Sequence, residues 1–79
     1  MKMGEEAITA PLPGKILEIK VKEGSIVKPG DVVAVIESMK MQNEIEAQTR
    51  GKVKEIKIHP GEAIDIGTEL IIIEKDGGE

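Results

Sequence analysis

The sequence predicts an all-β domain, a flattened barrel-sandwich of two four-stranded antiparallel sheets related by a quasi-twofold internal repeat. The apolar side chains are mainly 13 Ile and 6 Val, and branching at Cβ suits a pleated sheet. Nine Gly and four Pro divide the 79 residues into short segments and leave no long stretch with helical spacing. The chain is long enough for one domain only.

The repeat, the third observation, appears when the sequence is shifted against itself by 37 positions, and no gap is needed. Segment 14–21 then falls on segment 51–58, and apolar residues and turn glycines match on both sides of it. The matched glycines are Gly24 with Gly61 and Gly30 with Gly67. Each copy alone would expose an Ile/Val face, so neither copy is expected to fold without the other.

Four strands are expected in each copy, separated by turns at Gly and Pro. In the first copy they span residues 7–10, 15–21, 25–27 and 31–37, and in the second copy 41–46, 52–58, 62–65 and 69–74. The turns lie at 22–24, 28–30, 59–61 and 65–67, and their glycines are expected at positive φ.

The long strand of each copy breaks the two-residue alternation of apolar side chains. Ile16, Ile19 and Val21 are spaced by three and then two residues, and the second copy repeats this spacing. We interpret the break as a β-bulge near residues 17–18 and 54–55, which would return the apolar side chains to one face. The alternative is a mixed, half-exposed face at Leu17.

The predicted domain spans residues 7–75, with repeat halves at 7–37 and 44–74 joined by a hairpin at 38–43. Residues 1–6 and 76–79 are expected to be flexible ends. The junction contains no Gly or Pro, which predicts a tight hairpin with its tip near Met39 and Lys40. The termini should lie at the opposite end of the domain.

The composition excludes several classes of function. A formal charge of −4 and the lack of aromatic residues argue against nucleic-acid binding. The single His, two Ser and absence of Cys predict neither a catalytic centre nor a metal site. No run approaches the ~20 apolar residues of a membrane span, so no direct membrane insertion is expected. A chain without Cys is compatible with a reducing compartment, and we expect a cytoplasmic location.

Lys40 is the candidate functional residue, because a hairpin tip on a rigid body would hold its amine exposed. Met39 and Met41 flank it, although Asn, Asp and Gly are usual in a solvated turn. Methionine side chains are adaptable and suit contact with a partner. The alternative is an ordinary solvated lysine.

Segment 37–45, with the sequence ESMKMQNEI, closely resembles the modification motif of biotin carboxyl carrier domains. The central Met-Lys-Met is the hallmark of that family, and Ser38 takes the place of the usual Ala. The resemblance covers about residues 7–75 and continues in segments 10–14, 27–31, 50–51 and 60–61. The gapless repeat leaves no room for the "thumb" insertion of some bacterial acetyl-CoA carboxylase carriers. The chain therefore resembles the thumbless carriers of other acyl-CoA carboxylases, pyruvate carboxylase and biotin-dependent decarboxylases.

The resemblance implies that a biotin protein ligase joins the carboxyl group of biotin to the amine of Lys40 as an amide. The domain would then carry carboxybiotin between a biotin carboxylase and a carboxyltransferase or decarboxylase subunit acting on an acyl-CoA or oxo-acid substrate. It would not itself be an enzyme, because the cofactor and its partners supply the chemistry. Met39 and Met41 would be recognised with the lysine, and Glu37, Ser38 and Glu44 would assist the ligase. We expect a monomer in isolation.

Two alternatives stay open. A lipoyl carrier domain has a similar fold and a modified hairpin lysine, but usually has an acidic residue before the lysine and a small one after it. An unmodified barrel-sandwich could also serve only for protein–protein contact. A second Met-Lys-Met triplet at residues 1–3 lies outside the repeat, so Lys2 is expected to stay unmodified if a ligase reads the folded hairpin.

Overall fold

The computed structural model describes residues 4–75, which form eight β-strands and no helix. The strands are β1 (Glu5–Thr9), β2 (Gly14–Ile19), β3 (Ile26–Val27), β4 (Val32–Ser38), β5 (Met41–Glu46), β6 (Gly51–Ile56), β7 (Ala63–Ile64) and β8 (Glu69–Lys75). No helix capable of crossing a membrane occurs in this part of the chain. The all-β prediction and the order of the eight strands are confirmed.

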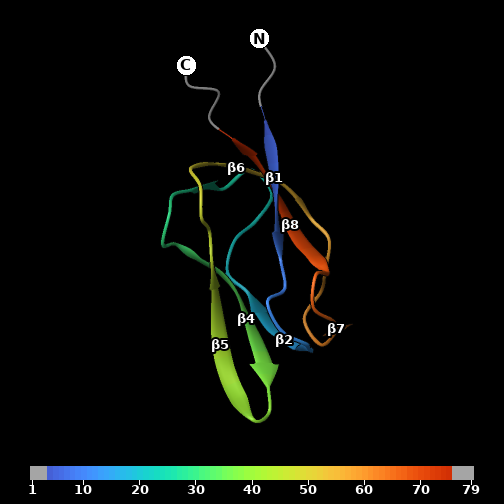
Figure 1. Ribbon diagram of the computed structural model, residues 1–79. Helices are drawn as coiled ribbons and strands as arrows, with labels where there is room; N and C mark the ends of the chain where they lie inside the picture. The colour runs from blue at the N-terminus through green and yellow to red at the C-terminus, as the bar shows by residue number, and fades with distance from the viewer. Residues whose placement is uncertain (1–3, 76–79) are drawn as a thin grey trace.

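The strands form two antiparallel sheets that each combine both copies of the repeat (Figure 1). The terminal sheet has the order β1-β8-β6-β3, and the hairpin sheet has the order β5-β4-β2-β7. A shift of 37 positions converts β1, β2, β3 and β4 into β5, β6, β7 and β8, and therefore converts each sheet into the other. Since each sheet contains two strands from each copy, neither copy can form a sheet of this architecture alone.

The core lies between the two sheets and is made of Ile, Val, Leu and Ala. Its members include repeat-equivalent pairs, such as Ile36 with Ile73 and Val33 with Leu70, all fully buried. The cluster consists of Ile8, Ala10, Ile16, Val27, Val33, Ala34, Ile36, Ile45, Ala47, Val53, Ile58, Ile64, Leu70, Ile71 and Ile73. No polar or charged residue of the described chain is buried. Branched aliphatic side chains are thus sufficient to fill this small core.

Both predicted bulges are confirmed. On β2 the pairing with β4 shifts between Ile16 and Glu18, so Leu17 is the inserted residue. On β6 the pairing with β8 shifts between Val53 and Glu55, which makes Lys54 the equivalent insertion. The extra residue lets the strand keep one apolar face despite the uneven spacing.

The four glycine turns share one hydrogen-bonding pattern. Their glycines have φ between 87° and 95°, and the residue after each glycine accepts a hydrogen bond through its side-chain oxygen from the first N–H of the turn. These acceptors are Ser25, Asp31, Glu62 and Thr68, each at 3.0 Å. The predicted positive φ at these glycines is confirmed.

Several strand boundaries differ from the prediction. β1 begins at Glu5, because Glu5 and Glu6 pair with the end of β8 rather than belonging to a flexible end. The third strand of each copy is reduced to two residues, because Ser25 and Glu62 close the preceding turns through their N–H groups. The predicted flexible segments at residues 1–3 and 76–79, and with them Lys2, lie outside the described residues.

The hairpin lies at one end of the domain, and the first and last described residues, Gly4 and Lys75, lie at the other (Figure 1). The start of β1 and the end of β8 are joined by a hydrogen bond of 2.8 Å from the Lys75 N–H to the Gly4 carbonyl. The β4–β5 hairpin therefore projects away from Gly4 and Lys75.

Candidate functional site

The candidate site is the tip of the β4–β5 hairpin. In this hairpin Glu37 pairs with Gln42, and Ser38 pairs with Met41. Two residues, Met39 and Lys40, are left to form the turn. The predicted tight hairpin and the position of its tip are confirmed.

The turn has an unusual backbone. Met39 has φ 53° and Lys40 has φ 65°, and no other non-glycine residue between 4 and 75 has a positive φ. Two positive φ values in a two-residue hairpin loop are the geometry of a type I′ turn, in which Asn-Gly is the preferred sequence. An L-residue with a Cβ atom pays about 1 kcal/mol or more for this conformation. The tip of the hairpin is therefore a strained segment.

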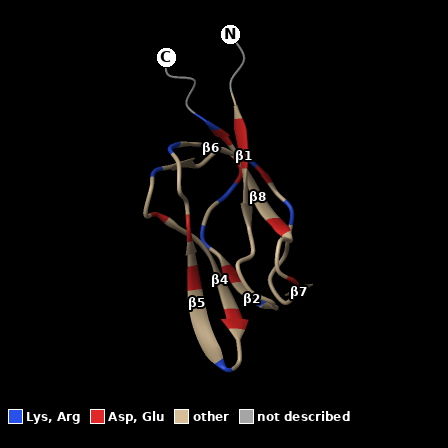
Figure 2. Ribbon diagram, viewed as in Figure 1, with Lys and Arg blue, Asp and Glu red and all other residues tan. Residues whose placement is uncertain are grey.

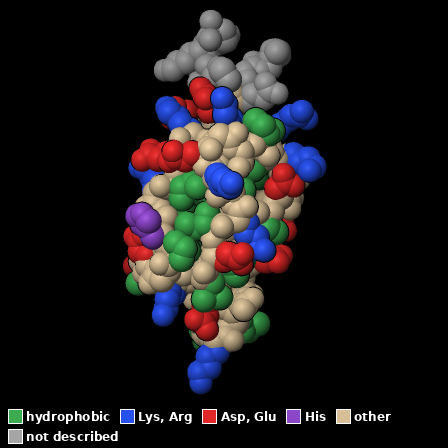
Figure 3. Space-filling model, turned by 180° about the vertical axis from the view of Figure 1, so that it is seen from behind, with side chains coloured by type: hydrophobic (Ala, Val, Ile, Leu, Met, Phe, Trp, Pro, Cys, Tyr) green, Lys and Arg blue, Asp and Glu red, His purple; other side chains and the backbone are tan. Residues whose placement is uncertain are grey.

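Packing does not compensate this strain, because the side chains of the tip project into solvent. Met39 is 92% exposed and Met41 is 66% exposed. Lys40 is exposed and makes no hydrogen bond or ion pair with any residue of the described chain. Figure 2 shows a basic residue at the end of the β4–β5 hairpin, and Figure 3 shows a basic side chain at the narrow end of the molecule. The Lys40 amine is thus accessible to a reagent or an enzyme from most directions.

The base of the hairpin is held more closely than its tip. A Cβ atom at Gly14 would lie 2.3 Å from the backbone carbonyl oxygen of Glu37 and 2.7 Å from the Ile36 side chain. Only glycine allows β2 to approach β4 this closely. Residues 13–15 and 37–40 together line an open concavity beside the tip. The strained turn is therefore mounted on a tightly packed base.

The remaining predicted site residues fall into two groups. Glu37 and Ser38 line the same concavity as Lys40, and Glu37 is exposed in a cross-strand row with Lys15 and Gln42. Glu44 lies further along β5, opposite Val35, and does not line this concavity. The structure thus places Glu37 and Ser38 at the site, but not Glu44.

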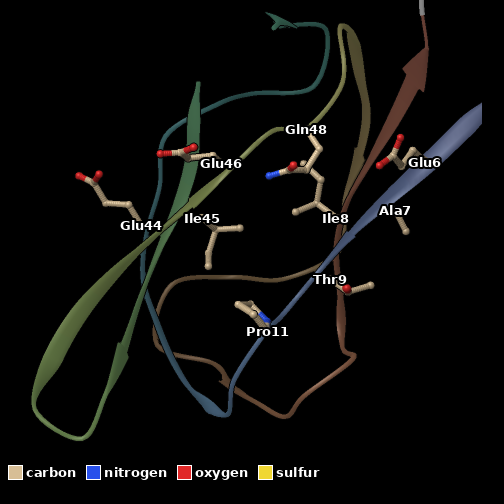
Figure 4. A pocket seen from close by; sticks show the side chains of 9 residues that line it. All are labelled: Glu6, Ala7, Ile8, Thr9, Pro11, Glu44, Ile45, Glu46 and Gln48. Carbon is tan, nitrogen blue, oxygen red and sulfur yellow. The ribbon is translucent and has the colours of Figure 1, made fainter. Parts of the chain in front are cut away.

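Glu44 instead lines a groove of about 400 Å³ between β1 and β5, the edge strands of the two sheets (Figure 4). Ile8 and its repeat-equivalent Ile45 both line the groove, and Glu44 and Glu46 make no ion pair within residues 4–75. The groove leaves no signal in the sequence, because it is formed by two edge strands whose proximity depends on how the sheets pack. None of residues 37–41 lines it, so it is separate from the candidate site.

No metal centre is found among residues 4–75. No group of His, Asp or Glu in this range is arranged to hold a metal ion, and no buried side-chain polar atom lacks a partner. What the site offers chemically is one exposed primary amine. A lysine in this position suits covalent attachment of a group through an amide bond, which needs access rather than a pocket.

A family model described as "Biotin-requiring enzyme" matches residues 6–73 of this chain. The chain is 55% identical over 42 residues to the gamma subunit of glutaconyl-CoA decarboxylase from Acidaminococcus fermentans, which covers 53% of this chain and 29% of that subunit. It is 52% identical over 44 residues to the gamma subunit of methylmalonyl-CoA decarboxylase from Veillonella parvula, covering 56% of this chain and 34% of that subunit. The chain thus spans about a third of the length of these two relatives.

Solved structures show the same fold within larger enzymes. A single-chain, multi-domain long-chain acyl-CoA carboxylase matches with a TM-score of 0.87 and 29% identity, over 92% of this chain and 7% of that one. The urea carboxylase of Kluyveromyces lactis matches with a TM-score of 0.84 and 27% identity, over 89% of this chain and 6% of that one. The fold described above is therefore one that recurs as a small part of large carboxylases.

Proposed function

The chain belongs to the biotin-requiring enzyme family, whose model matches 6–73, and from this premise we propose that Lys40 is the residue to which biotin is attached. Within the family the chain is a biotin carrier domain and not itself an enzyme. The observation that supports Lys40 is its position: an exposed amine without partners in the described chain, at the tip of the hairpin that joins the two copies.

The residues around Lys40 fit covalent attachment of biotin. The amide would form between the Lys40 Nζ and the carboxyl group of biotin, and no side chain has to move aside. Met39 and Met41 provide exposed apolar contacts on both sides of the amine. Since these contacts contribute little to packing within residues 4–75, their value would lie in recognition by another protein.

Attached biotin would supply the chemistry of carboxyl-group transfer, and the chain's own residues would present it. The core and the Gly14 contact hold the base of the hairpin, so the position of the Lys40 backbone is set by the fold. The lysine side chain adds a flexible tether of four methylene groups. Tethering gives the attached group a high effective concentration at each active site that the domain can reach.

We further propose that the domain serves a multi-subunit biotin-dependent decarboxylase or carboxylase, on an acyl-CoA or oxo-acid substrate. The support for this assignment is the function of the relatives, which are gamma subunits of two acyl-CoA decarboxylases. The proposed partners are a biotin protein ligase, a biotin carboxylase, and a carboxyltransferase or decarboxylase subunit. A cytoplasmic location, where these enzymes would act together, completes the proposal.

The attachment site is tested by co-expressing the chain with a biotin protein ligase and measuring its intact mass. We expect the mass increase of one biotinyl group, and peptide mapping should place it on Lys40. Lys40→Arg keeps the charge but removes the primary amine, and should abolish the increase. Lys52→Arg is the matched control, because Lys52 is an exposed lysine of β6 in the other sheet, lies outside the hairpin site and should be dispensable.

Three results would contradict the assignment. Biotin on Lys2 would show that a Met-Lys-Met triplet is sufficient without the hairpin. An unmodified chain in the presence of active ligase would favour a purely structural barrel-sandwich. A lipoyl mass increase with a lipoate ligase, and no biotinyl increase, would favour the lipoyl alternative.

A further inference from the structure

The repeat allows the outer faces of the two sheets to be compared position by position. On the terminal sheet, Lys54 forms an ion pair with Glu5, reaching across β8, and Lys57 forms one with Glu69 at 3.2 Å. These charged residues surround Ile72, which is half-buried between the buried Ile71 and Ile73 and so points away from the core. The outer face of the terminal sheet is therefore covered by paired charges.

The equivalent positions on the hairpin sheet carry different chemistry. Lys54 and Glu5 correspond to Leu17 and Gln42, so both charges of the first ion pair are missing. The second pair loses one charge, because Val32 stands at the position equivalent to Glu69. The matching lysine, Lys20, directly follows β2, and its Nζ instead lies 3.8 Å from Glu18 Oε1.

An apolar strip results on the outer face of the hairpin sheet, formed by Leu17, Val32 and Val35. Leu17 is 37% exposed, and Val32 is half-buried. Val35 is 6% exposed but does not belong to the core cluster, since its neighbours Ala34 and Ile36 face the core. We call these three residues the outer strip.

The outer strip has the composition of a protein-docking surface. Glu18 and Glu44 are the cross-strand neighbours of Val35, and Glu37 lies two residues further along β4, all three exposed. An apolar centre with a polar rim is the usual anatomy of an interface. The strip is also continuous with the candidate site, because β4 runs from Val32 directly to the turn that presents Lys40.

The proteins that could bind the outer strip differ in what else they can recognise on this chain. Enzymes that act after attachment can recognise the biotinyl group itself. The enzyme that forms the amide meets an unmodified lysine and must distinguish it from the other lysines by protein surface alone. A second copy of the chain fits less well, because self-association through this face would bring Glu37 and Glu44, which form no ion pair within residues 4–75, close to the same carboxylates of the other copy.

Resting on the proposed function, we propose that the outer strip docks the enzyme that attaches biotin to Lys40. The complementary surface of that enzyme is apolar at its centre and flanked by cationic side chains that face Glu37 and Glu44, which form no ion pair within residues 4–75. The hairpin is thereby bound from its outer face, which fixes the side from which the Lys40 amine enters the active site.

Leu17→Lys is the decisive variant, because lysine already occupies the equivalent bulge in the terminal sheet and the backbone tolerates it there. We expect kcat/KM for biotinylation by a purified biotin protein ligase to fall about tenfold, mainly through KM, when a charge enters the centre of the interface. Lys54→Leu is the matched control with the reverse change on the other sheet, and should alter the rate by less than about twofold.

A binding measurement separates docking from chemistry. With the Lys40→Arg variant and unlabelled ligase, amide NMR signals of residues 17, 32 and 35 should shift, while those of residues 54, 69 and 72 should not. Wild-type kinetics for Leu17→Lys, or an equal loss for Lys54→Leu, would overturn the docking surface and leave Lys40 as the attachment site. A wild-type chain that is never modified on Lys40 would overturn the proposed function as well.

Discussion

The four glycine turns and the hairpin turn use the same region of backbone conformation in opposite ways. In the glycine turns, the residue with positive φ has no Cβ, and the side chain that follows it satisfies the first N–H of the turn. In the hairpin turn, Met39 and Lys40 adopt positive φ with their side chains exposed. The glycine turns thus stabilise the fold. The hairpin turn instead costs conformational energy, and packing of its side chains does not offset that cost.

This difference indicates that the sequence of the hairpin turn was selected for something other than folding stability. A sequence optimised only for this fold would place Asn-Gly at the hairpin tip. The observed Met-Lys costs conformational energy and exposes an apolar side chain. Strain of this kind is found at functional sites, where the surrounding structure is rigid enough to hold it. The Gly14 contact at the base of the hairpin provides that rigidity.

The largest predicted effect concerns this base. Gly14→Ala places a Cβ atom 2.3 Å from the Glu37 carbonyl oxygen, so β2 and β4 must separate. We expect a loss of about 3 kcal/mol or more in the free energy of unfolding, measured by chemical denaturation. Gly51→Ala should behave alike, because its Cβ would lie 2.3 Å from the Glu74 carbonyl oxygen. A loss below about 1 kcal/mol would mean that the base is not tightly packed.

The second prediction isolates the conformational requirement of the glycine turns. Gly24 has φ 95°, and an added Cβ would meet nothing within 4 Å. Gly24→Ala should therefore cost about 1–2 kcal/mol through backbone strain alone. Gly61→Ala, at the equivalent position, should lose a similar amount, because an added Cβ there also meets nothing within 4 Å. If both variants have the same free energy of unfolding as the wild type, a Cβ at positive φ is not costly in these turns, and the distinction drawn between the glycine turns and the hairpin turn fails.

The third prediction is a gain in the free energy of unfolding rather than a loss. Met39→Asn introduces a residue that tolerates positive φ, and should raise the free energy of unfolding by about 0.5–1 kcal/mol. Lys40 is retained, so biotinylation of the same variant can be measured. We expect the rate to fall, since the exposed Met39 side chain is a proposed recognition contact. A variant that is both less stable and equally well modified would contradict the interpretation of the tip.

The sequence predicted those features that local patterns determine. The three-then-two spacing of Ile16, Ile19 and Val21 was sufficient to locate the bulge, because an apolar residue on the wrong face is costly. The turn glycines and the hairpin tip followed from the repeat. Pattern alone could not show which strands share a sheet, because the apolar faces of the two copies are interchangeable and either pairing would bury them.

The conformation of the tip was also beyond sequence reasoning. Propensity argues against positive φ at Met39 and Lys40, and only the pairing of Ser38 with Met41 imposes it. The β1–β5 groove and the outer strip likewise depend on tertiary packing. The repeat did contain a usable signal for the strip, since Leu17 replaces the charge of Lys54 at an equivalent position.

The smallest predicted effect distinguishes the turn at Gly30, by its response to pH, from the two turns whose acceptor is a hydroxyl group. In the turn at Gly30, the acceptor is the Asp31 carboxylate, which receives the Lys28 N–H at 3.0 Å and the Lys28 ammonium at 3.3 Å. The backbone hydrogen bond, and then the side-chain bond, hold the pKa of Asp31 below its ordinary value of 3.8. A carboxyl group whose pKa is lower in the folded than in the unfolded state stabilises the fold at pH values above its unfolded-state pKa. This stabilisation is lost as the pH falls through its folded-state pKa.

Asp31→Ser tests this contribution, because Ser25 and Thr68 accept the same hydrogen bond through a hydroxyl group that does not titrate in this range. Denaturant titrations between about pH 5 and pH 2 should show a shallower loss of stability in the variant than in the wild type. Added salt should change this difference little, since the leading cause is a hydrogen bond rather than a distant charge. Identical acid profiles would mean that the carboxylate acts only as a polar cap, interchangeable with the hydroxyl groups of the equivalent turns.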